Sequence, residues 1–281
     1  MKKKLTPAQM SKRLGQSSAY RIAYKDHDFL DSGYARPARL QLELLKPETI
    51  LRREGIASTI VCFGGTRIVE PKEARAELRK IENKLKHRPS DKELRRQMRV
   101  AKSVLAKSRF YDEAREFARL VSIESQGNDN HEYVIVTGGG PGIMEAANRG
   151  AYDIGAKSIG LNITLPMEQE PNAYITPELC MQFHYFAIRK MHFMLRAKAL
   201  VAFPGGYGTL DELFEGLTLV QTKKIKPLPV ILFGEKFWKG FIDFEYLAKQ
   251  GTIDPEDLKL FVYADHAADA WDYIKYFYQG E

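Results

Sequence analysis

Short apolar runs alternate with amphipathic stretches from about Ser58 to the end of the chain. This alternation constrains the fold most, because a strand followed by a helix and then by another strand builds a parallel sheet. Continuous runs of Val, Ile and Leu are typical of strands that are buried on both faces. We therefore predict an α/β fold with a doubly wound parallel sheet. The predicted strands cover residues 59–63, 133–137, 158–163, 199–203, 229–233 and 260–263.

Helical patterns fill the gaps between these strands, and short connections join them, as a doubly wound sheet requires. The chain has 281 residues, of which 44% are hydrophobic, so a large domain with an ample core can form. We expect this domain to span residues 56–281 and residues 1–55 to form an N-terminal helical extension of open role. The predicted helices of the domain cover residues 143–154, 187–198, 210–223, 237–250 and 267–278.

The segment 71–109 carries the positive charge of the chain. It holds 14 Lys and Arg against 5 Asp and Glu, a balance of +9, whereas the remainder carries −2. Apolar residues recur there at spacings of four, three and four, which predicts an inserted hairpin of two helices with narrow apolar seams. Ser90 and Glu93 fit a capping box that would start the second helix. The seam residues are Ala74, Leu78, Ile81 and Leu85, followed by Leu94, Met98, Ala101 and Leu105.

We interpret this hairpin as a packing or oligomerisation device, because an apolar seam of this kind indicates contact with another helix and not a catalytic site. The segment contains no Phe, Tyr or Trp, so it lacks the stacking platform of single-strand binders. A charge run on a helix is more often a solvated face. We therefore do not expect a nucleic-acid partner.

Composition disfavours several other classes of protein. No apolar run approaches the ~18 residues that a membrane helix needs, and the basic N-terminus is not followed by the apolar stretch of a secretory signal. Cys62 and Cys180 lie far apart without a C-x-x-C motif, and the six histidines include no H-E-x-x-H. We expect a soluble, cytoplasmic protein without a membrane partner, a metal or another cofactor.

A glycine-rich turn follows the predicted strand 133–137 and precedes a helix. Its residues 138–142 read Gly-Gly-Gly-Pro-Gly. Glycines let a ligand approach the backbone closely, and a helix start offers unpaired N–H groups and the positive end of the helix dipole. The turn is therefore a candidate anion site, with a tight turn that binds nothing as the alternative.

A second glycine-rich loop, Pro-Gly-Gly-Tyr-Gly-Thr at residues 204–209, follows the strand 199–203. Because the carboxyl ends of parallel strands meet at one edge of a sheet, the two loops predict a single crevice suited to a nucleotide phosphate. No Lys-Ser/Thr pair follows the glycines as in a Walker A motif. Neither loop is a full G-x-G-x-x-G with an acidic residue about 20 residues further on. ATPases and dinucleotide dehydrogenases are therefore disfavoured.

Three motifs in this order resemble the Lonely Guy (LOG) family over roughly residues 58–275. Residues 204–212 match the motif P-G-G-x-G-T-x-x-E, residues 138–144 match the other glycine motif, and Arg189-Lys190 fall on the helix before the second loop. The resemblance implies a Rossmann-like fold and a cytokinin riboside 5′-monophosphate phosphoribohydrolase. Such an enzyme cleaves the N-glycosidic bond of a purine nucleoside 5′-monophosphate, with adenine or N6-modified adenine as the base, and releases the base and ribose 5-phosphate.

The resemblance also implies roles for single residues. Glu212 and Arg189 are expected to be catalytic. A carboxylate near C1′ stabilises the oxocarbenium-like transition state of glycoside cleavage, and an arginine can offset the negative charge of the departing purine. Metal ligands and cofactors are not expected. The residues expected to bind substrate are Gly139, Gly140, Lys190, Gly205, Gly206, Tyr207, Gly208, Thr209, Leu210, Asp211 and Thr218.

Several of these residues have simpler interpretations. Thr209 and Glu212 also form a T-x-x-E capping box, in which Glu212 would only tie down the helix start. Arg189 could form a surface ion pair. His184 could donate a proton to the base, although a lone histidine more often packs.

The resemblance also implies an oligomeric state, and it raises the question of whether the chain is a lysine decarboxylase. Active sites of LOG proteins lie beside a dimer interface, so we expect a homodimer or a larger homo-oligomer. Similar sequences have been labelled lysine decarboxylases, but that chemistry needs a pyridoxal-phosphate lysine, and no S-x-H-K-like context exists here.

The chain departs from the LOG pattern in three places: the insertion 71–109, the extension 1–55, and Phe-Gly-Gly-Thr-Arg at residues 63–67, where relatives more often have F-G-S-A-R. These departures resemble the longer branch of the family. The alternative function is a non-catalytic nucleotide- or cofactor-binding carrier or sensor, because molybdenum-cofactor carriers share the fold. The presence of both Arg189 and Glu212 favours the enzyme.

Overall fold

The computed structural model describes residues 4–126, 131–166 and 170–279. The chain divides into two compact units, Met1–Glu48 and Thr49–Glu281, and helix α3 (Arg36–Arg53) crosses the boundary. The first unit contains α1 (Pro7–Gly15), α2 (His27–Asp31) and short 3₁₀ turns at Ser18–Tyr20, Ala23–Lys25 and Gly33–Ala35. A capping box starts α1, because Thr6 Oγ1 accepts from Gln9 N at 3.3 Å and Gln9 Oε1 accepts from Thr6 N at 2.9 Å.

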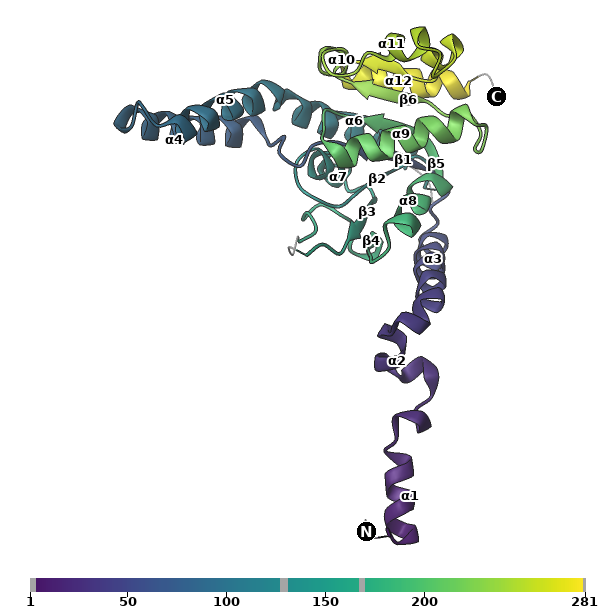
Figure 1. Cartoon of the computed structure of the whole chain (residues 1–281). Helices are drawn as coiled ribbons and strands as arrows, with labels where there is room; N and C mark the ends of the chain where they lie inside the picture. The colour runs from purple at the N-terminus through teal and green to yellow at the C-terminus, as the bar shows by residue number, and fades with distance from the viewer. Residues whose placement is uncertain (1–3, 127–130, 167–169, 280–281) are drawn as a thin grey trace. The chain divides into compact units, whose positions relative to one another are not determined.

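The second unit is built on a parallel sheet, which confirms the predicted α/β fold (Figure 1). Seven described strands follow the order β4-β3-β2-β1-β5-β6-β7. Val61 of β1 lies between Val136 of β2 and Leu200 of β5. The order of the strands reverses at β1 and β5, where a doubly wound sheet opens a crevice at its carboxyl edge. The strands are β1 (Thr59–Phe63), β2 (Val134–Thr137), β3 (Ser158–Ile163), β4 (Cys180–Phe183), β5 (Ala197–Ala202), β6 (Val230–Phe233) and β7 (Val262–Ala264).

Helices cover both faces of this sheet, because alternate strand residues point to opposite sides. Ile60 and Cys62 pack against α6 (Arg109–Ser125), α7 (Ile143–Tyr152) and α12 (Ala267–Tyr278). Val61 and Phe63 belong to the other core, with α8 (Phe186–Leu195), α9 (Tyr207–Gln221), α10 (Glu235–Lys239) and α11 (Phe244–Lys249). Burial of each large apolar side chain stabilises the fold by about 1.5–3 kcal/mol. Short 3₁₀ turns lie at Pro177–Leu179 and Pro255–Lys259.

The inserted segment forms the predicted helical hairpin of α4 (Pro71–His87) and α5 (Lys92–Lys107), which lie side by side (Figure 1). The seam residues of both helices are buried or half-buried. The predicted capping box at Ser90 is wrong. Asp91 caps α5 instead, because its Oδ1 accepts from the backbone N–H groups of Glu93 and Leu94, both at 3.0 Å.

Among the predicted helices, 143–154 and 210–223 differ from α7 and α9 by two or three residues at their ends, and two others differ more. The helix 187–198 ends as α8 at Leu195, because Ala197 pairs with Thr59 in the sheet and so belongs to β5. The helix 237–250 is two helices, α10 and α11. Gly240 ends the first, and Asp243 starts the second by accepting from Tyr246 N at 2.9 Å.

The sequence pattern did not predict strand β4. It is a short edge strand of four residues with alternating exposure, so it lacks the continuous apolar run that marks the central strands. None of the described helices is both long and apolar enough to cross a bilayer.

Candidate active site

A cleft of about 390 Å³ opens at the carboxyl edge of the sheet, where the strand order reverses. Its walls come from the loops that follow β1, β2 and β3 and from the first turns of α8 and α9. This is the position at which doubly wound sheets bind ligands. The cleft brings together eight residues expected at the site: Gly140, Arg189, Gly206, Tyr207, Gly208, Thr209, Asp211 and Glu212.

The N-terminus of α9 faces this cleft. Gly206 is the N-cap residue, and no side-chain cap occupies the helix start. Leu210 N donates to Gly206 O at 3.1 Å, so the N–H groups of the three preceding residues, Tyr207 to Thr209, have no partner within the helix. A Cβ added to Gly206 or Gly208 would meet nothing within 4 Å, so a ligand can approach the backbone here. This helix end can bind an anion.

Glu212 lies one turn further along α9. The alternative in which it completes a capping box with Thr209 is wrong, because the helix already starts at Tyr207 and Thr209 is its third residue. The Glu212 side chain is 7% exposed. Burial raises the pKa of the Glu212 carboxyl to about 7, although the positive charges of Lys190 and Arg189 oppose this rise. A carboxyl with such a pKa can act in proton transfer or charge stabilisation at neutral pH.

Arg189 enters the cleft from α8. Its Nε donates to Leu161 O at 2.7 Å, its guanidinium lies 5.1 Å from the ring centre of Phe193, and its Nη2 lies 3.5 Å from Gly138 O. Burial lowers the pKa of Arg189, and the charge of Glu212 opposes that shift. An arginine side chain nevertheless stays charged in proteins. These contacts hold one cation in a fixed position at the cleft and are not the surface ion pair considered above.

The glycine-rich turn after β2 is tied to the protein by its backbone. Gly139 N donates to Thr137 Oγ1 at 3.0 Å, and its carbonyl accepts from Asn172 N at 2.9 Å. The carbonyl of Gly140 accepts from Asn172 Nδ2 at 3.1 Å. Gly139 has a φ of +74°, and a Cβ there would overlap with the Asn162 side chain. Glycine is therefore required at this position by the fold itself.

Five of the residues expected to bind substrate are not among those that line the cleft: Gly139, Lys190, Gly205, Leu210 and Thr218. Gly205 packs against the side chain of Thr209, which leaves no room for a Cβ. Leu210 packs against the core, and Thr218 Oγ1 donates to Phe214 O at 2.7 Å on an exposed part of α9. His184 is also exposed and outside the cleft lining.

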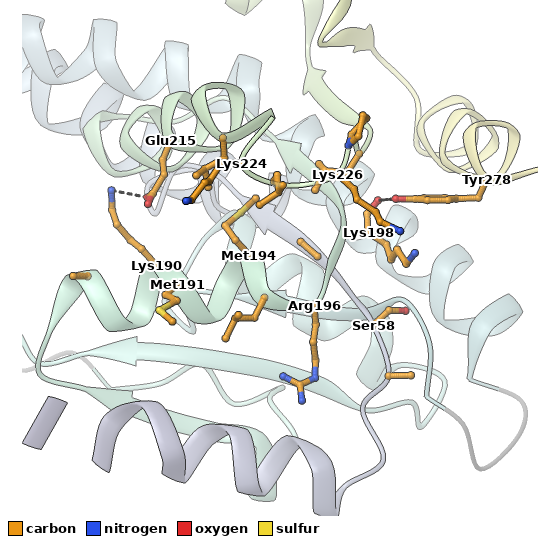
Figure 2. Close-up of a pocket in the computed structure, with 18 residues that line it drawn as sticks. Ser58, Lys190, Met191, Met194, Arg196, Lys198, Glu215, Lys224, Lys226 and Tyr278 are labelled. Carbon is orange, nitrogen blue, oxygen red and sulfur yellow. Dashed lines mark hydrogen bonds and ion pairs between the residues drawn. The ribbon is translucent and has the colours of Figure 1, made fainter. Parts of the chain in front are cut away.

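Lys190 lies in a second, larger pocket of about 700 Å³ (Figure 2). Its ammonium pairs with Glu215 Oε2 at 2.9 Å and with Asp211 Oδ2 at 2.8 Å. This pocket also contains Ser58 and Lys198, which lie near the amino ends of β1 and β5. Doubly wound sheets bind ligands at the carboxyl ends of their strands. The cleft at that edge is therefore the better candidate for the active site, although it is smaller than the second pocket.

Further residues line the cleft that the sequence analysis did not assign to the site: Phe63, Gly64, Gly65, Thr66, Gly138, Met144, Asn162, Ile163, Leu165 and Phe186. Two signals could have found some of them. Gly64 and Gly65 directly follow a predicted strand, at the same edge as the other glycine loops. Asn162 is a polar residue inside an otherwise apolar strand.

No group of three or more His, Cys, Asp and Glu side chains suited to a metal ion occurs within residues 4–126, 131–166 and 170–279. The polar groups of the cleft are backbone N–H groups, one guanidinium and two carboxylates, together with the hydroxyls and amide of Thr66, Tyr207, Thr209 and Asn162. The N–H groups and the guanidinium suit an anionic ligand.

Comparison with protein families gives a match at residues 144–274 to the model described as "Possible lysine decarboxylase". Two curated relatives from Oryza sativa subsp. japonica are named as probable cytokinin riboside 5′-monophosphate phosphoribohydrolases. LOGL3 is 27% identical over 50% of this chain and 67% of its own length. LOG4 is 28% identical over 48% of this chain and 59% of its own length. The matched region thus spans only about three-fifths to two-thirds of these relatives.

Two solved structures are also similar. The X-ray structure of TM1055, a Northeast Structural Genomics Consortium target, is 17% identical, with coverage of 78% of this chain and 98% of that one and a TM-score of 0.45. The Moco carrier protein from Chlamydomonas reinhardtii is 20% identical, with coverage of 62% and 90% and a TM-score of 0.41. The matches to the family model and the curated relatives confirm the resemblance suggested by the motifs.

Proposed function

We propose that this chain, which resembles the Lonely Guy phosphoribohydrolases, hydrolyses the N-glycosidic bond of a purine nucleoside 5′-monophosphate. The base is adenine or an N6-modified adenine, and the products are the free base and ribose 5-phosphate. One observation carries the proposal: the buried Glu212 and the half-buried Arg189, of opposite charge, line one cleft with the open N-terminus of α9.

The 5′-phosphate binds at the start of α9 in this proposal. The N–H groups of Tyr207, Gly208 and Thr209 have no helical partner, and the helix dipole is positive at this end. Gly206 and Gly208 leave space for the phosphate oxygens next to the backbone. The Thr209 hydroxyl belongs to the same turn and lines the cleft, so it can donate a further hydrogen bond.

Glu212 then faces the ribose, because it lies one helical turn beyond the phosphate. As the bond between C1′ and the base nitrogen breaks, positive charge develops on the sugar, and a carboxylate beside C1′ stabilises it. The departing base nitrogen keeps the electron pair of the broken bond and takes up a proton from solvent. The oxygen of a water molecule forms the new bond to C1′, and Glu212 can accept the proton that this water loses. A carboxylate is needed for both tasks, so activity requires the deprotonated form of Glu212.

Arg189 offsets the negative charge that the departing base acquires. Its guanidinium is held by Leu161 O and by the ring of Phe193, so it does not have to be ordered when the substrate binds. A fixed cation in a partly buried position acts more strongly than the same cation in water.

The decarboxylase description of the family model does not fit the residues of this cleft. Pyridoxal phosphate would be held as a Schiff base by a lysine, and no lysine is among the described residues that line the cleft. Lys190, the nearest lysine in sequence to Arg189, is paired with Asp211 and Glu215 instead.

A homodimer or larger homo-oligomer completes the proposal. Apolar side chains of α8 and α9 are exposed, and the first of them also lines the cleft: Phe186 to 52%, Met191 to 42%, Leu195 to 50% and Phe214 to 39%. A patch of this kind is typical of an interface between proteins. Light scattering of the purified chain during size-exclusion chromatography should give at least twice the mass of 32.1 kDa.

The test of the activity is incubation of the purified chain with AMP, N6-prenylated AMP, GMP, CMP and adenosine. Free base and ribose 5-phosphate should form together from AMP or prenylated AMP, and adenosine should react poorly because it lacks the phosphate. Folded protein that releases base from none of the monophosphates, yet binds them, would favour the nucleotide carrier or sensor.

A further inference from the structure

The hairpin of α4 and α5 contributes no residue to the cleft. Its apolar seams are covered within the hairpin itself, since Ala74 is 3%, Ile81 6% and Ala101 8% exposed. The remaining surface of both helices is therefore almost entirely polar. What this surface can bind depends on how the basic and acidic side chains are arranged around each helix.

Four of the six Lys and Arg residues of α4 lie on one side of the helix. With about 100° of rotation per residue, Lys72, Arg75, Arg79 and Lys86 lie about 90–150° from the centre of the seam. All four are exposed. Among the acidic residues of α4, Glu73 and Glu77 lie on the opposite side of the seam by the same spacing, whereas Glu82 lies about 70° from its centre on the basic side.

The second helix repeats this arrangement. Lys92, Arg95, Arg99 and Lys102 of α5 lie about 70–150° from the centre of its seam, in the same rotational sense. All four are exposed. Glu93 lies on the opposite side, where it pairs with Arg96 at 2.7 Å.

The two basic stripes share one face of the hairpin. In an antiparallel pair of helices whose seams face each other, positions at the same angle from the seam fall on the same side of the pair. Among the described residues, no ion pair engages Arg79, Lys86 or Arg99, which belong to these stripes. The other face is mixed, because Lys80 there pairs with Glu77 at 3.4 Å.

We propose that this basic face binds the phosphate backbone of double-stranded DNA, without reading its sequence. Exposed Lys and Arg side chains neutralise phosphates when a protein binds the backbone, and such contacts position the protein but do not specify bases. The stripe from Lys72 to Lys86 is about 21 Å long at 1.5 Å per residue. The two stripes lie on helices whose axes are about 8–10 Å apart, and their side chains point outward, so they can reach phosphates on both sides of the ~12 Å major groove.

The segment 71–109 contains no aromatic residue, which disfavoured a nucleic-acid partner above. Aromatic side chains are needed only to stack on bases. Their absence argues against single strands, whose binding relies on stacking platforms. Double-stranded RNA is a poorer fit, because its major groove is deep and narrow. A membrane surface is also a poorer fit, since amphipathic membrane helices bury an apolar face, and Val100, which is 45% exposed, lies away from the basic stripes.

The test compares two triple variants of the full chain that lose the same charge. Arg79→Gln/Lys86→Gln/Arg99→Gln removes cations from the basic face, and Lys80→Gln/Lys84→Gln/Arg96→Gln removes them from the mixed face. Affinity for a fluorescent DNA duplex is measured by anisotropy between about 50 and 200 mM salt. Circular dichroism and base release from AMP verify that each variant is folded, independently of DNA binding.

The basic-face variant should lose at least about tenfold in affinity, and the slope of log K against log salt should fall by about 3. The mixed-face variant should stay within about twofold of the original chain. Equal losses in both variants, no duplex binding at the lowest salt, or equally tight binding to single strands, RNA duplexes or phosphatidylserine vesicles would overturn the proposal.

Discussion

In the loop after β2, a Cβ on Gly138 would lie 2.5 Å from Arg189 Nη2, and one on Gly139 would overlap with Asn162. In the loop after β5, a Cβ on Gly206 or Gly208 would meet nothing within 4 Å. Both loops are rich in glycine and both approach the same cleft. The first loop is filled by the protein at both of these glycines, whereas the second is open at Gly206 and Gly208 and filled only at Gly205.

The comparison separates two uses of glycine. The loop after β2 needs glycine so that Arg189 and Asn162 can pack tightly against its backbone, and it thereby helps to fix the cation of the cleft. The loop after β5 needs no glycine for internal packing at Gly206 and Gly208, so these positions are free to serve a ligand.

Glu212→Gln should reduce kcat/KM for base release by about 10³-fold or more, because it removes the carboxylate that stabilises the sugar cation. Steady-state release of adenine from AMP measures this loss. Glu215→Gln is the matched control on the same helix, since Glu215 does not line the cleft and should cost only a few-fold. Comparable losses in the two variants would remove Glu212 from its proposed role.

Gly139→Ala should destabilise the fold by about 2–4 kcal/mol, through a strained backbone and an overlap with Asn162. Urea unfolding measures the effect. Gly155→Ala separates the two causes, because Gly155 has a φ of +72° but nothing within 4 Å of a Cβ, and it should cost only about 1–2 kcal/mol. If both variants unfold alike, the packing of the loop after β2 is less tight than described.

Glu212→Gln should also change stability with pH. The pKa of Glu212 is about 7 in the folded chain, above the ordinary value of 4.5. Between these values the folded chain binds more protons than the unfolded chain, so stability falls as pH rises through this window and the full penalty applies above pH 7. The glutamine variant escapes the penalty and should be more stable than the original chain by about 1–3 kcal/mol at pH 8, with no gain near pH 4. A gain that is the same at both pH values would contradict the raised pKa.

Gly206→Ala should leave the free energy of unfolding within about 0.5 kcal/mol, because its φ of −105° suits alanine and the Cβ has space. The KM for AMP should nevertheless rise about tenfold, since the methyl group occupies space that the phosphate needs. Urea unfolding and initial-rate kinetics measure the two effects on one sample. An unchanged KM would place the phosphate elsewhere.

The sequence predicted the central strands well because each is a continuous apolar run buried on both faces. It missed β4, an edge strand with alternating exposure, and it extended α8 into residues that the ladder between Thr59 and Ala197 assigns to β5. Such boundaries depend on pairing between segments that are distant in sequence, which local patterns do not contain.

The candidate site was predictable only where its residues lie close together in sequence. The loop at residues 204–209 and Glu212 lie close together in sequence, so one motif contains most of that wall. That Lys190 follows Arg189 in the sequence did not predict where its side chain lies, because successive residues of a helix point in different directions. The Lys190 ammonium pairs with Asp211 and Glu215 instead of entering the cleft. The contribution of Gly64 and Gly65 depends on the sheet bringing β1 next to β5.

The most direct test of the account is a crystal structure of the Glu212→Gln variant with AMP, which the variant should bind without cleavage. The phosphate is predicted to accept hydrogen bonds from the backbone N–H groups of Tyr207 to Thr209, with the substituted side chain facing C1′. A phosphate held by the loop at residues 138–142, or a ribose turned away from position 212, would contradict the account.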